Sequence, residues 1–267
     1  MNTLKNKFSI IREKIQNSNE YTIFSVGDSI TEGFRSTSAE NTYTAVFARR
    51  LGEHFPQKTV IRYDGKRHKH ENSALMPLAT YGEPISVQNG TETGGKITVI
   101  RSGIGGNTVR RLLNRRDDYI GKVIDSRTAD LFIISAGIND SLIKDASKYV
   151  PPEKYAEDLW ELIELIRKNH PNADIIFMTP TWHDHGEVNT SSVDDYANTM
   201  ICVAQEADIP VIDQHKIWME HLIVGGDNYG QGDWLVPLPK GDSCHPSDTG
   251  HAAMAEELIR SLFSESK

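Results

Sequence analysis

Short apolar runs alternate along this chain with amphipathic segments, and the two patterns predict different elements. Runs rich in β-branched and aromatic residues predict buried strands at 21–26, 58–63, 96–100, 131–136, 175–178 and 209–212. Apolar residues three or four positions apart predict helices at 43–52, from 109, from 152, at 194–207, at 219–224, and after a cap at Ser247 as far as 263. Strands alternating with helices form a parallel sheet covered on both faces. We therefore expect an α/β fold, a three-layer αβα sandwich around a central parallel sheet.

The first residues add a helix to this pattern, over about 3–17. Its apolar residues fall on one helical face, which predicts an amphipathic helix packed on the domain. These residues are Leu4, Phe8, Ile11 and Ile15. The rest of the chain has no internal repeat and no linker, so we expect one domain over 1–267.

Residues 64–96 interrupt the alternation. They are polar, without a sustained period, and too long for a plain connection, which predicts an inserted segment. Within them, Asn89-Gly90 lies between the runs 85–88 and 96–100, an arrangement typical of a β-hairpin.

The composition argues against several classes of protein. Apolar residues make up 38% of the 267 residues and charged residues 25%, as is usual for a soluble globular protein. A net charge of -8 without a basic run argues against nucleic-acid binding. No apolar stretch has the length of a membrane span, and the first residues contain no signal-peptide core. Cys202 and Cys244 give no disulfide framework, so the cytoplasm is the simplest location.

Polar motifs follow several of the predicted strands. Gly27-Asp28-Ser29, Gly105-Gly106 and Asn139 each come after one of them. The carboxyl ends of parallel strands line one edge of a sheet, where open α/β proteins bind ligands. Asp242-x-x-His245 lies on the loop before the last helix and is expected at the same edge.

Together these residues supply the parts that a serine nucleophile needs. The hydroxyl of Ser29 requires a base to take its proton, and His245 can be that base. Asp242, three residues earlier, can fold back to hold the tautomer of the histidine ring. The amides of Ser29 and of a glycine in the Gly105-Gly106 turn, with the side-chain amide of Asn139, can stabilise an oxyanion.

In this order the motifs resemble the four blocks of the SGNH, or GDSL, hydrolase family, over residues 27–250. The four similar segments are Gly27-Asp28-Ser29, Ile104 to Thr108, Gly137-x-Asn139-Asp140 and Asp242-x-x-His245. The resemblance implies a flavodoxin-like αβα fold, with Gly106 as the oxyanion glycine and Asn139 as the side-chain donor. It also implies ester hydrolysis through an acyl-enzyme, with no metal or organic cofactor.

Two positions depart from the pattern of that family. Arg101 stands where the second block often has Asn, and Gly105 replaces a common Ser. Both changes can alter hydrogen bonding in the loop, but neither removes an oxyanion donor.

Some neighbouring residues offer alternatives for the catalytic roles. Gly241-Asp242-Ser243 repeats the nucleophile tripeptide, but it follows a Pro/Gly loop rather than a buried strand. Cys244 adjoins His245, and side chains next to each other in sequence rarely point at each other. Asp28 is expected to pin the turn beside Ser29 rather than to orient the histidine.

Other ligand sites are weaker alternatives. Gly103-x-Gly105-Gly106 lacks the third glycine of a dinucleotide fingerprint and the Lys-Ser/Thr of a phosphate loop. Histidine pairs in polar loops, without a Cys or carboxylate cluster, are expected to be solvated rather than metal-bound. These pairs are His68 with His70, and His183 with His185. His251, early in the last helix, is expected to be structural.

Within the family, the sequence looks most like the carbohydrate acetylesterases, which implies a small-molecule or oligosaccharide ester substrate. The resemblance rests on the run from Gly103 to Arg110, on Met178-Thr179-Pro180 and on the His-Pro-Ser block. Trp182 and Trp234 lie in predicted rim loops and could stack on sugar rings, although packing of the loops explains them equally well. Asp28 is a further candidate for substrate contact.

Two other functions stay open. A lipase, lysophospholipase or thioesterase of the same fold would need an apolar acyl channel, whereas the polar rim of 64–96 and 225–241 predicts short acyl chains, acetyl above all. A catalytically silent glycan-binding domain would not need the catalytic residues that this chain retains. No nucleic-acid or membrane partner is expected, and the oligomeric state, a homo-oligomer included, stays open.

Overall fold

The computed structural model describes residues 2–67, 79–114, 129–142, 145–182, 193–224, 234 and 244–263. The strands are β1 (Glu20–Gly27), β2 (Thr59–Arg67), β3 (Ala79–Tyr81), β4 (Ile85–Gln88), β5 (Lys96–Gly103), β6 (Leu131–Ser135), β7 (Asp174–Met178) and β8 (Val211–Ile212). The helices are α1 (Asn2–Asn17), α2 (Ser29–Glu32), α3 (Tyr43–His54), α4 (Val109–Asn114), α5 (Pro152–Asn169), α6 (Val193–Glu206), α7 (Gln214–Val224) and α8 (Asp248–Phe263), with a 3-10 turn, η1, at Ala39–Asn41.

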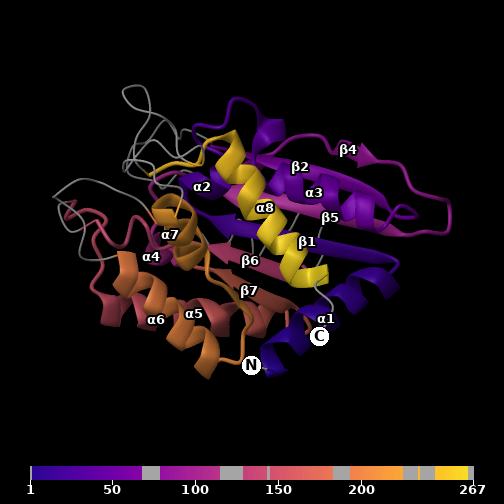
Figure 1. Ribbon diagram of the computed structural model, residues 1–267. Coiled ribbons are helices and arrows are strands. Elements are labelled where there is room, and N and C mark those ends of the chain that lie inside the picture. The colour runs from indigo at the N-terminus through magenta and orange to yellow at the C-terminus, as the bar shows by residue number, and fades with distance from the viewer. Residues whose placement is uncertain are drawn as a thin grey trace.

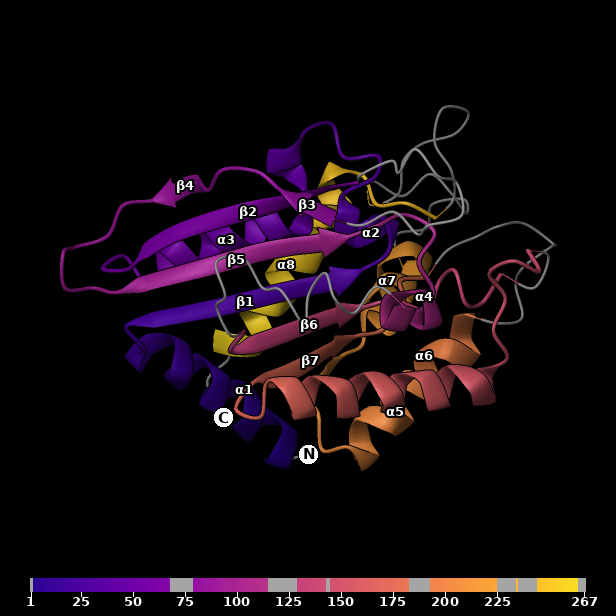
Figure 2. The same cartoon turned by 180° about the vertical axis from the view of Figure 1, so that it is seen from behind.

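One sheet runs through the middle of the molecule in the order β3-β2-β5-β1-β6-β7-β8, and β4 pairs with β2 (Figure 1). Strands β2, β5, β1, β6, β7 and β8 are parallel to their neighbours in this order. Strands β3 and β4 lie antiparallel to β2. Helices α1, α3 and α8 cover one face of the sheet, and α4, α5 and α6 cover the other (Figure 2). The three-layer αβα sandwich predicted from the sequence is confirmed.

Strand β1 lies at the centre of this arrangement and is buried from Tyr21 to Gly27. Its side chains alternate between two cores: Ile23 packs beneath α1, α3 and α8, while Phe24 and Val26 pack beneath α4 and α5. Burial on both faces explains why this strand appears in the sequence as a continuous apolar run. Helix α1 contributes Phe8, Ile11 and Ile15 to the first core.

The predicted hairpin between 85–88 and 96–100 is wrong. Strand β4 pairs antiparallel with the outer edge of β2, where Arg62 faces Ile85, and β5 lies parallel between β2 and β1. Nearly every residue of β5 is buried, whereas β4 is exposed or half-buried. The apolar strand therefore occupies the interior of the sheet and the polar strand its edge.

Two predicted boundaries also differ from the structure. Helix α7 begins at Gln214, ahead of the predicted Met219, because the carboxylate of Asp213 accepts the N–H of Lys216 at 3.0 Å as an N-cap. Strand β8 begins at Val211 rather than Ile209, whose N–H donates to Ala204 O at 2.8 Å and so continues the end of α6.

The register of the parallel strands brings their carboxyl ends level. Gly27 pairs with both Gly103 and Ser135, and Ser135 pairs with Met178. Gly103 permits the closest approach, since a Cβ there would lie 1.9 Å from the backbone nitrogen of Glu32. The segments that follow β1, β5 and β6 therefore meet at one edge of the sheet.

Candidate active site

The connection after β1 holds Ser29 at that edge. Ser29 is the first residue of α2, a single helical turn. The carboxylate of Asp28 caps this turn by accepting the N–H of Ile30 at 2.9 Å, as the sequence predicts for this aspartate. Asp28 and Ile30 are buried, but Ser29 is partly exposed. The turn thus presents one hydroxyl to the surface of the edge.

His245 reaches this hydroxyl from the other end of the chain. Its Nε2 lies 2.8 Å from Oγ of Ser29, a hydrogen-bond distance at which the ring can take the proton. The loop of His245 leads into α8, whose first turn is capped by Oγ of Ser247 through the N–H of Gly250 at 3.2 Å. The structure therefore brings together a hydroxyl and an imidazole that are 216 positions apart in sequence.

Asp242, the predicted orienting acid, lies outside the described residues, as does its neighbour Ser243. Cys244 is buried in the core beneath α1, α3 and α8, and His245 turns the other way to meet Ser29. A thiol nucleophile at Cys244 is therefore disfavoured by its burial.

A carboxylate on α8 fastens the segment after the nucleophile to the loop of the base. Asp248 accepts the N–H of Thr37 at 2.9 Å, the hydroxyl of Thr37, and Nδ2 of Asn41 at 2.8 Å. Partial burial opposes ionisation, but the hydrogen bonds from Thr37 lower the pKa of Asp248 below its ordinary value. Sequence reasoning missed this residue, whose only signal is an acidic side chain in the first turn of a helix.

The predicted oxyanion donors lie on the segments that follow β5 and β6. Gly106 has a φ of 80°, a left-handed conformation that favours glycine. Asn139 is 6% exposed, and its Nδ2 donates to the carbonyl of Asn107 at 3.0 Å. An amide nitrogen carries two hydrogens, so this contact ties Asn139 to the Gly106 loop and leaves a second hydrogen for another acceptor.

Two charged residues that the sequence did not assign to the site hold the Gly106 loop against the nucleophile turn. The carboxylate of Glu32 accepts the N–H of Gly105, and the guanidinium of Arg101 donates to the carbonyl of Glu32. Arg101 also bonds Oδ1 of Asp64 at 3.3 Å. Arg101, the arginine that departs from the family pattern, thus joins β2, β5 and α2, and an effect of this departure on the hydrogen bonds of the Gly105-Gly106 loop stays a prediction.

This network continues into a buried arginine on β2. The side chain of Arg62 is fully buried and makes a bidentate pair with Glu40, at 2.7 and 3.0 Å. Hydrogen bonding from Arg62 holds the pKa of Glu40 below its ordinary value. A third bond, at 3.2 Å, joins Arg62 to Asp64, the partner of Arg101. The arginines and carboxylates are thereby paired, as burial of charge requires.

Two aspartates beside the site, Asp28 and Asp140, are buried, and burial disfavours the charged form of a carboxyl group. Desolvation raises the pKa of Asp28 to about 6, although the N–H of Ile30 and the charge of His245 oppose the rise. Desolvation also raises the pKa of Asp140 to about 8, although this carboxyl accepts the N–H of Val109 at 3.1 Å. Asp140 is therefore mainly a neutral acid at pH 7, holding the start of α4 directly behind the Gly106 loop.

The two predicted rim tryptophans pack against the protein on at least one side. Trp182 is half-buried against the core, and the ring of Trp234 stacks on His221 with centroids 3.7 Å apart. His251 is buried, and burial lowers its pKa to about 4, so it is a neutral ring within the core beside Tyr43. Contact of Trp182, Trp234 or the buried Asp28 with substrate stays a prediction.

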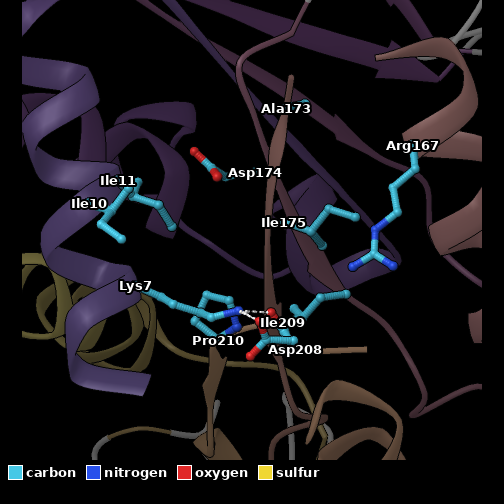
Figure 3. A pocket seen from close by; sticks show the side chains of 10 residues that line it. All are labelled: Lys7, Ile10, Ile11, Arg167, Ala173, Asp174, Ile175, Asp208, Ile209 and Pro210. Atoms are coloured by element: carbon cyan, nitrogen blue, oxygen red, sulfur yellow. Dashed lines mark hydrogen bonds and ion pairs between the residues drawn. The ribbon is translucent and has the colours of Figure 1, made fainter. Parts of the chain in front are cut away.

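A cavity of about 230 Å³ opens at the opposite edge of the sheet (Figure 3). It lies between α1 and the amino ends of β7 and β8, and an ion pair between Lys7 and Asp208 lies beside it. Ser29, His245 and Asn139 do not line it. Its other charged lining residues are also engaged, Asp174 with Lys14 and Arg167 with the carbonyl of Ala207, and its lining lacks a serine and a histidine like those at the carboxyl edge.

The described residues contain no group of three or more His, Cys, Asp or Glu side chains suited to hold a metal ion. The candidate metal histidines His68, His70, His183 and His185 lie outside them. None of the described helices is both long and apolar enough to cross a bilayer.

Comparison with known proteins adds a family and a set of similar folds. The sequence profile of the GDSL-like lipase/acylhydrolase family matches residues 78–253, a range that includes Gly106, Asn139 and His245 but begins after Ser29. No curated protein matches the chain.

Several solved structures share the fold at low sequence identity. An acetyl xylan esterase, AlAXEase, has a TM-score of 0.62 and 18% identity, covering 91% of this chain and 100% of its own. Axe2, an acetylxylan esterase from Geobacillus stearothermophilus, has a TM-score of 0.62 and 21% identity, covering 92% and 95%. A lipase/acylhydrolase from Enterococcus faecalis has a TM-score of 0.60 and 18% identity, covering 91% and 95%.

Proposed function

Because the chain belongs to the GDSL-like lipase/acylhydrolase family and is thus an ester-bond hydrolase, we propose that it is a serine esterase that removes short acyl groups from a carbohydrate. The observation that carries the proposal is the 2.8 Å contact between Oγ of Ser29 and Nε2 of His245. The family match itself does not reach the nucleophile block, and this contact is the support for Ser29 as the nucleophile.

The proposed reaction proceeds through an acyl-enzyme. Oγ of Ser29 attacks the ester carbonyl while His245 takes its proton, and the carbonyl oxygen becomes an oxyanion. The amides of Ser29 and Gly106 and the side chain of Asn139 stabilise that charge. The intermediate collapses, the leaving alcohol takes the proton from His245, and the acyl group stays on Ser29.

Water completes the cycle. His245 removes a proton from the water, which attacks the acyl carbonyl, and the same donors stabilise the second oxyanion. The bond to Oγ then breaks and Ser29 regains its proton from His245. Throughout, the predicted role of Asp242 is to hold the other ring nitrogen of His245, so that Nε2 faces the serine.

Two considerations support an acetylated carbohydrate as substrate. The similar structures include acetyl xylan esterases, although at 18–22% identity they share only the fold with this chain. The polar composition of 64–96 and 225–241 offers hydroxyl-binding groups but little apolar area to a fatty chain.

A series of nitrophenyl esters tests this proposal. We expect kcat/KM to fall from acetyl to butyryl to octanoyl. An apolar channel would instead raise it severalfold per added methylene, since each buried CH₂ is worth about 0.8 kcal/mol. A rise continuing to octanoyl would favour a lipase or thioesterase. Failure of a fluorophosphonate probe to label the native protein at Ser29 would favour a catalytically silent binding domain.

A further inference from the structure

The segment that follows the nucleophile turn exposes an aromatic ring beside the catalytic base. Phe34 is 47% exposed, and its ring lies edge to face with the ring of His245, with centroids 4.7 Å apart. The other large apolar side chains exposed in the described part of the chain are Ile10, on α1, and Ile85, on the edge strand β4. Phe34 alone among these three lies at the carboxyl edge of the sheet.

The backbone holds Phe34 in a defined position next to the nucleophile. Its N–H donates to the carbonyl of Ser29 itself at 2.9 Å, and the hydroxyl of Ser36 closes the same turn on Gly33 O at 2.7 Å. Asp248 then fixes Thr37 to the helix that follows His245. These bonds hold the ring of Phe34 beside Ser29 and His245, where the alcohol part of a bound ester can contact it.

Arg35 adds a donor group to this surface. Its guanidinium carbon lies 5.0 Å from the centroid of the Phe34 ring, within the range of a cation–π contact. Arg35 has a φ of 72°, a conformation that non-glycine residues seldom adopt and that is concentrated at functional sites. Aromatic face and planar donor group together match a pyranose ring, which has apolar C–H faces and hydroxyls around its rim.

The reaction geometry decides which part of an ester would meet this surface. The carbonyl oxygen must point to the oxyanion donors, which lie on the segments after β5 and β6. The leaving alcohol must lie near Nε2 of His245, because that atom returns the proton to it. Phe34 is the ring that packs on His245. The alcohol part of the substrate, rather than its acyl part, is therefore the part that reaches Phe34 and Arg35.

We propose that Phe34 and Arg35 form the subsite for the sugar ring that carries the scissile acyl group. The part of the Phe34 ring that Arg35 and His245 leave exposed packs against a C–H face of the sugar, and Arg35 donates hydrogen bonds to its hydroxyls. This inference rests on the proposed function, and it adds the residues that select the alcohol.

The test compares two acetate esters that differ only in their alcohol. Kcat/KM is measured by proton release for 2-O-acetyl methyl β-xylopyranoside and for ethyl acetate, and the ratio of the first to the second is the readout. We expect Phe34→Ala to lower this ratio about tenfold, which corresponds to roughly 1.4 kcal/mol of lost contact with the sugar. Arg35→Ala should lower it by a smaller factor, about threefold.

Conservative variants separate a sugar platform from a structural role. Phe34→Tyr should keep the ratio within about twofold of the native value, and Phe34→Leu, which keeps bulk without an aromatic face, should fall between native and Phe34→Ala. Ile85→Ala, a similarly exposed position on β4, is the matched control and should leave the ratio unchanged. Circular dichroism establishes that each variant is folded.

Three results would overturn the inference. An equal loss of kcat/KM on both esters would make Phe34 a support for His245 instead of a subsite. If Phe34→Ala lowered kcat/KM for the octanoyl ester more than for the acetyl ester and left the sugar ratio unchanged, Phe34 would contact the acyl chain. Absence of turnover of either acetate by the native protein would overturn the proposed function, and this inference with it; the first two results leave that function standing.

Discussion

The two edges of the central sheet both carry charged residues, but they hold them in different ways. At the amino edge, Lys14 meets Asp174 at 2.8 Å in a pair whose side chains are 44% and 24% exposed. At the carboxyl edge, Asp28 and Asp140 are buried, and each accepts a backbone N–H. The amino edge has solvated ion pairs beside an open cavity. The carboxyl edge has buried carboxyl groups that accept hydrogen bonds from the backbone of the turns.

Helix direction accounts for the difference. Helices α2 and α4 begin at the carboxyl edge, and the first N–H groups of a helix have no partners within it. Those groups attract carboxylates and, during a reaction, an oxyanion. Helices α5 and α6 end at the amino edge, where carbonyls are left instead. This difference favours the carboxyl edge, rather than the cavity at the amino edge, as the candidate active site.

Removal of the nucleophile at the carboxyl edge should cause the largest loss of activity of any substitution at either edge. Ser29→Ala should reduce ester turnover by roughly four orders of magnitude or more, because it removes the hydroxyl proposed to form the acyl-enzyme. Steady-state kinetics with nitrophenyl acetate measure this, and circular dichroism checks the fold. Abolition of activity by Ser243→Ala, together with an active Ser29→Ala, would show that the nucleophile was assigned wrongly.

Loss of the side-chain oxyanion donor should come next. Asn139→Ala should lower kcat about a hundred- to a thousandfold with little change in KM, because its amide acts on charge that develops only in the transition state. An effect confined to KM would make Asn139 a substrate-binding residue.

Glu32 is a positioning residue, and its removal should have an intermediate effect. Glu32→Ala frees the N–H of Gly105 and should lower kcat about tenfold through misplacement of Gly106, with KM nearly unchanged. Glu32→Gln retains an acceptor oxygen and should recover most of the loss. A purely structural role would instead lower the thermal midpoint without this recovery of kcat.

Burial of Asp140 predicts a specific dependence of stability on pH. Its pKa rises from 3.8 to about 8 in the folded protein, so between these values the folded state binds a proton that the unfolded state does not. Stability from this group is present at low pH and is lost as pH rises toward 8. Between pH 6 and 8, urea denaturation should show a decline on the order of 1 kcal/mol per pH unit in the native protein.

Asp140→Asn keeps an oxygen that can accept the N–H of Val109 and has no proton to lose. Its free energy of unfolding should therefore decline less steeply over pH 6 to 8 than that of the native protein. Asp28, whose pKa is raised to about 6, still titrates in the lower part of this window, but it is present in both proteins and the comparison of their slopes isolates Asp140. Parallel pH profiles for the two proteins would contradict a buried neutral carboxyl at position 140.

The amino edge should be the least sensitive. Lys7→Ala breaks the pair with Asp208, opens the cavity further, and should change kcat/KM by less than about twofold. Its effect on the free energy of unfolding should stay below about 1 kcal/mol, as for other surface ion pairs. A tenfold loss of kcat/KM in Lys7→Ala would mean that the amino edge affects catalysis, so that activity would not depend on the carboxyl edge alone.

The sequence by itself determined the parallel core of the sheet and the helices that cover it, and it supplied the candidate residues of the site. Continuous apolar runs such as 131–136 mark buried parallel strands, and a polar motif after such a run falls at the carboxyl edge in any α/β sheet. This pattern points to Ser29 and Asn139 as candidates without coordinates, whereas the choice of Gly106 came from the family resemblance, and Asp242 and His245 were proposed from their spacing on a loop. The fold and the family were predicted correctly. The role of Asp242 and the oxyanion geometry stay predictions.

Tertiary structure alone decided the partners of residues that lie far apart in sequence. Strand β4 could pair with β5 or β2 by local pattern, and the demand for burial of β5 selected β2. The partners of Glu32, Arg101 and Asp248 could not be read from local pattern, because each bonds to a segment distant in sequence. Phe34 looks like an ordinary apolar residue until its ring is seen exposed beside His245. Periodicity reports which face a residue occupies, whereas the contacts that shape a site depend on chain segments that only the fold brings together.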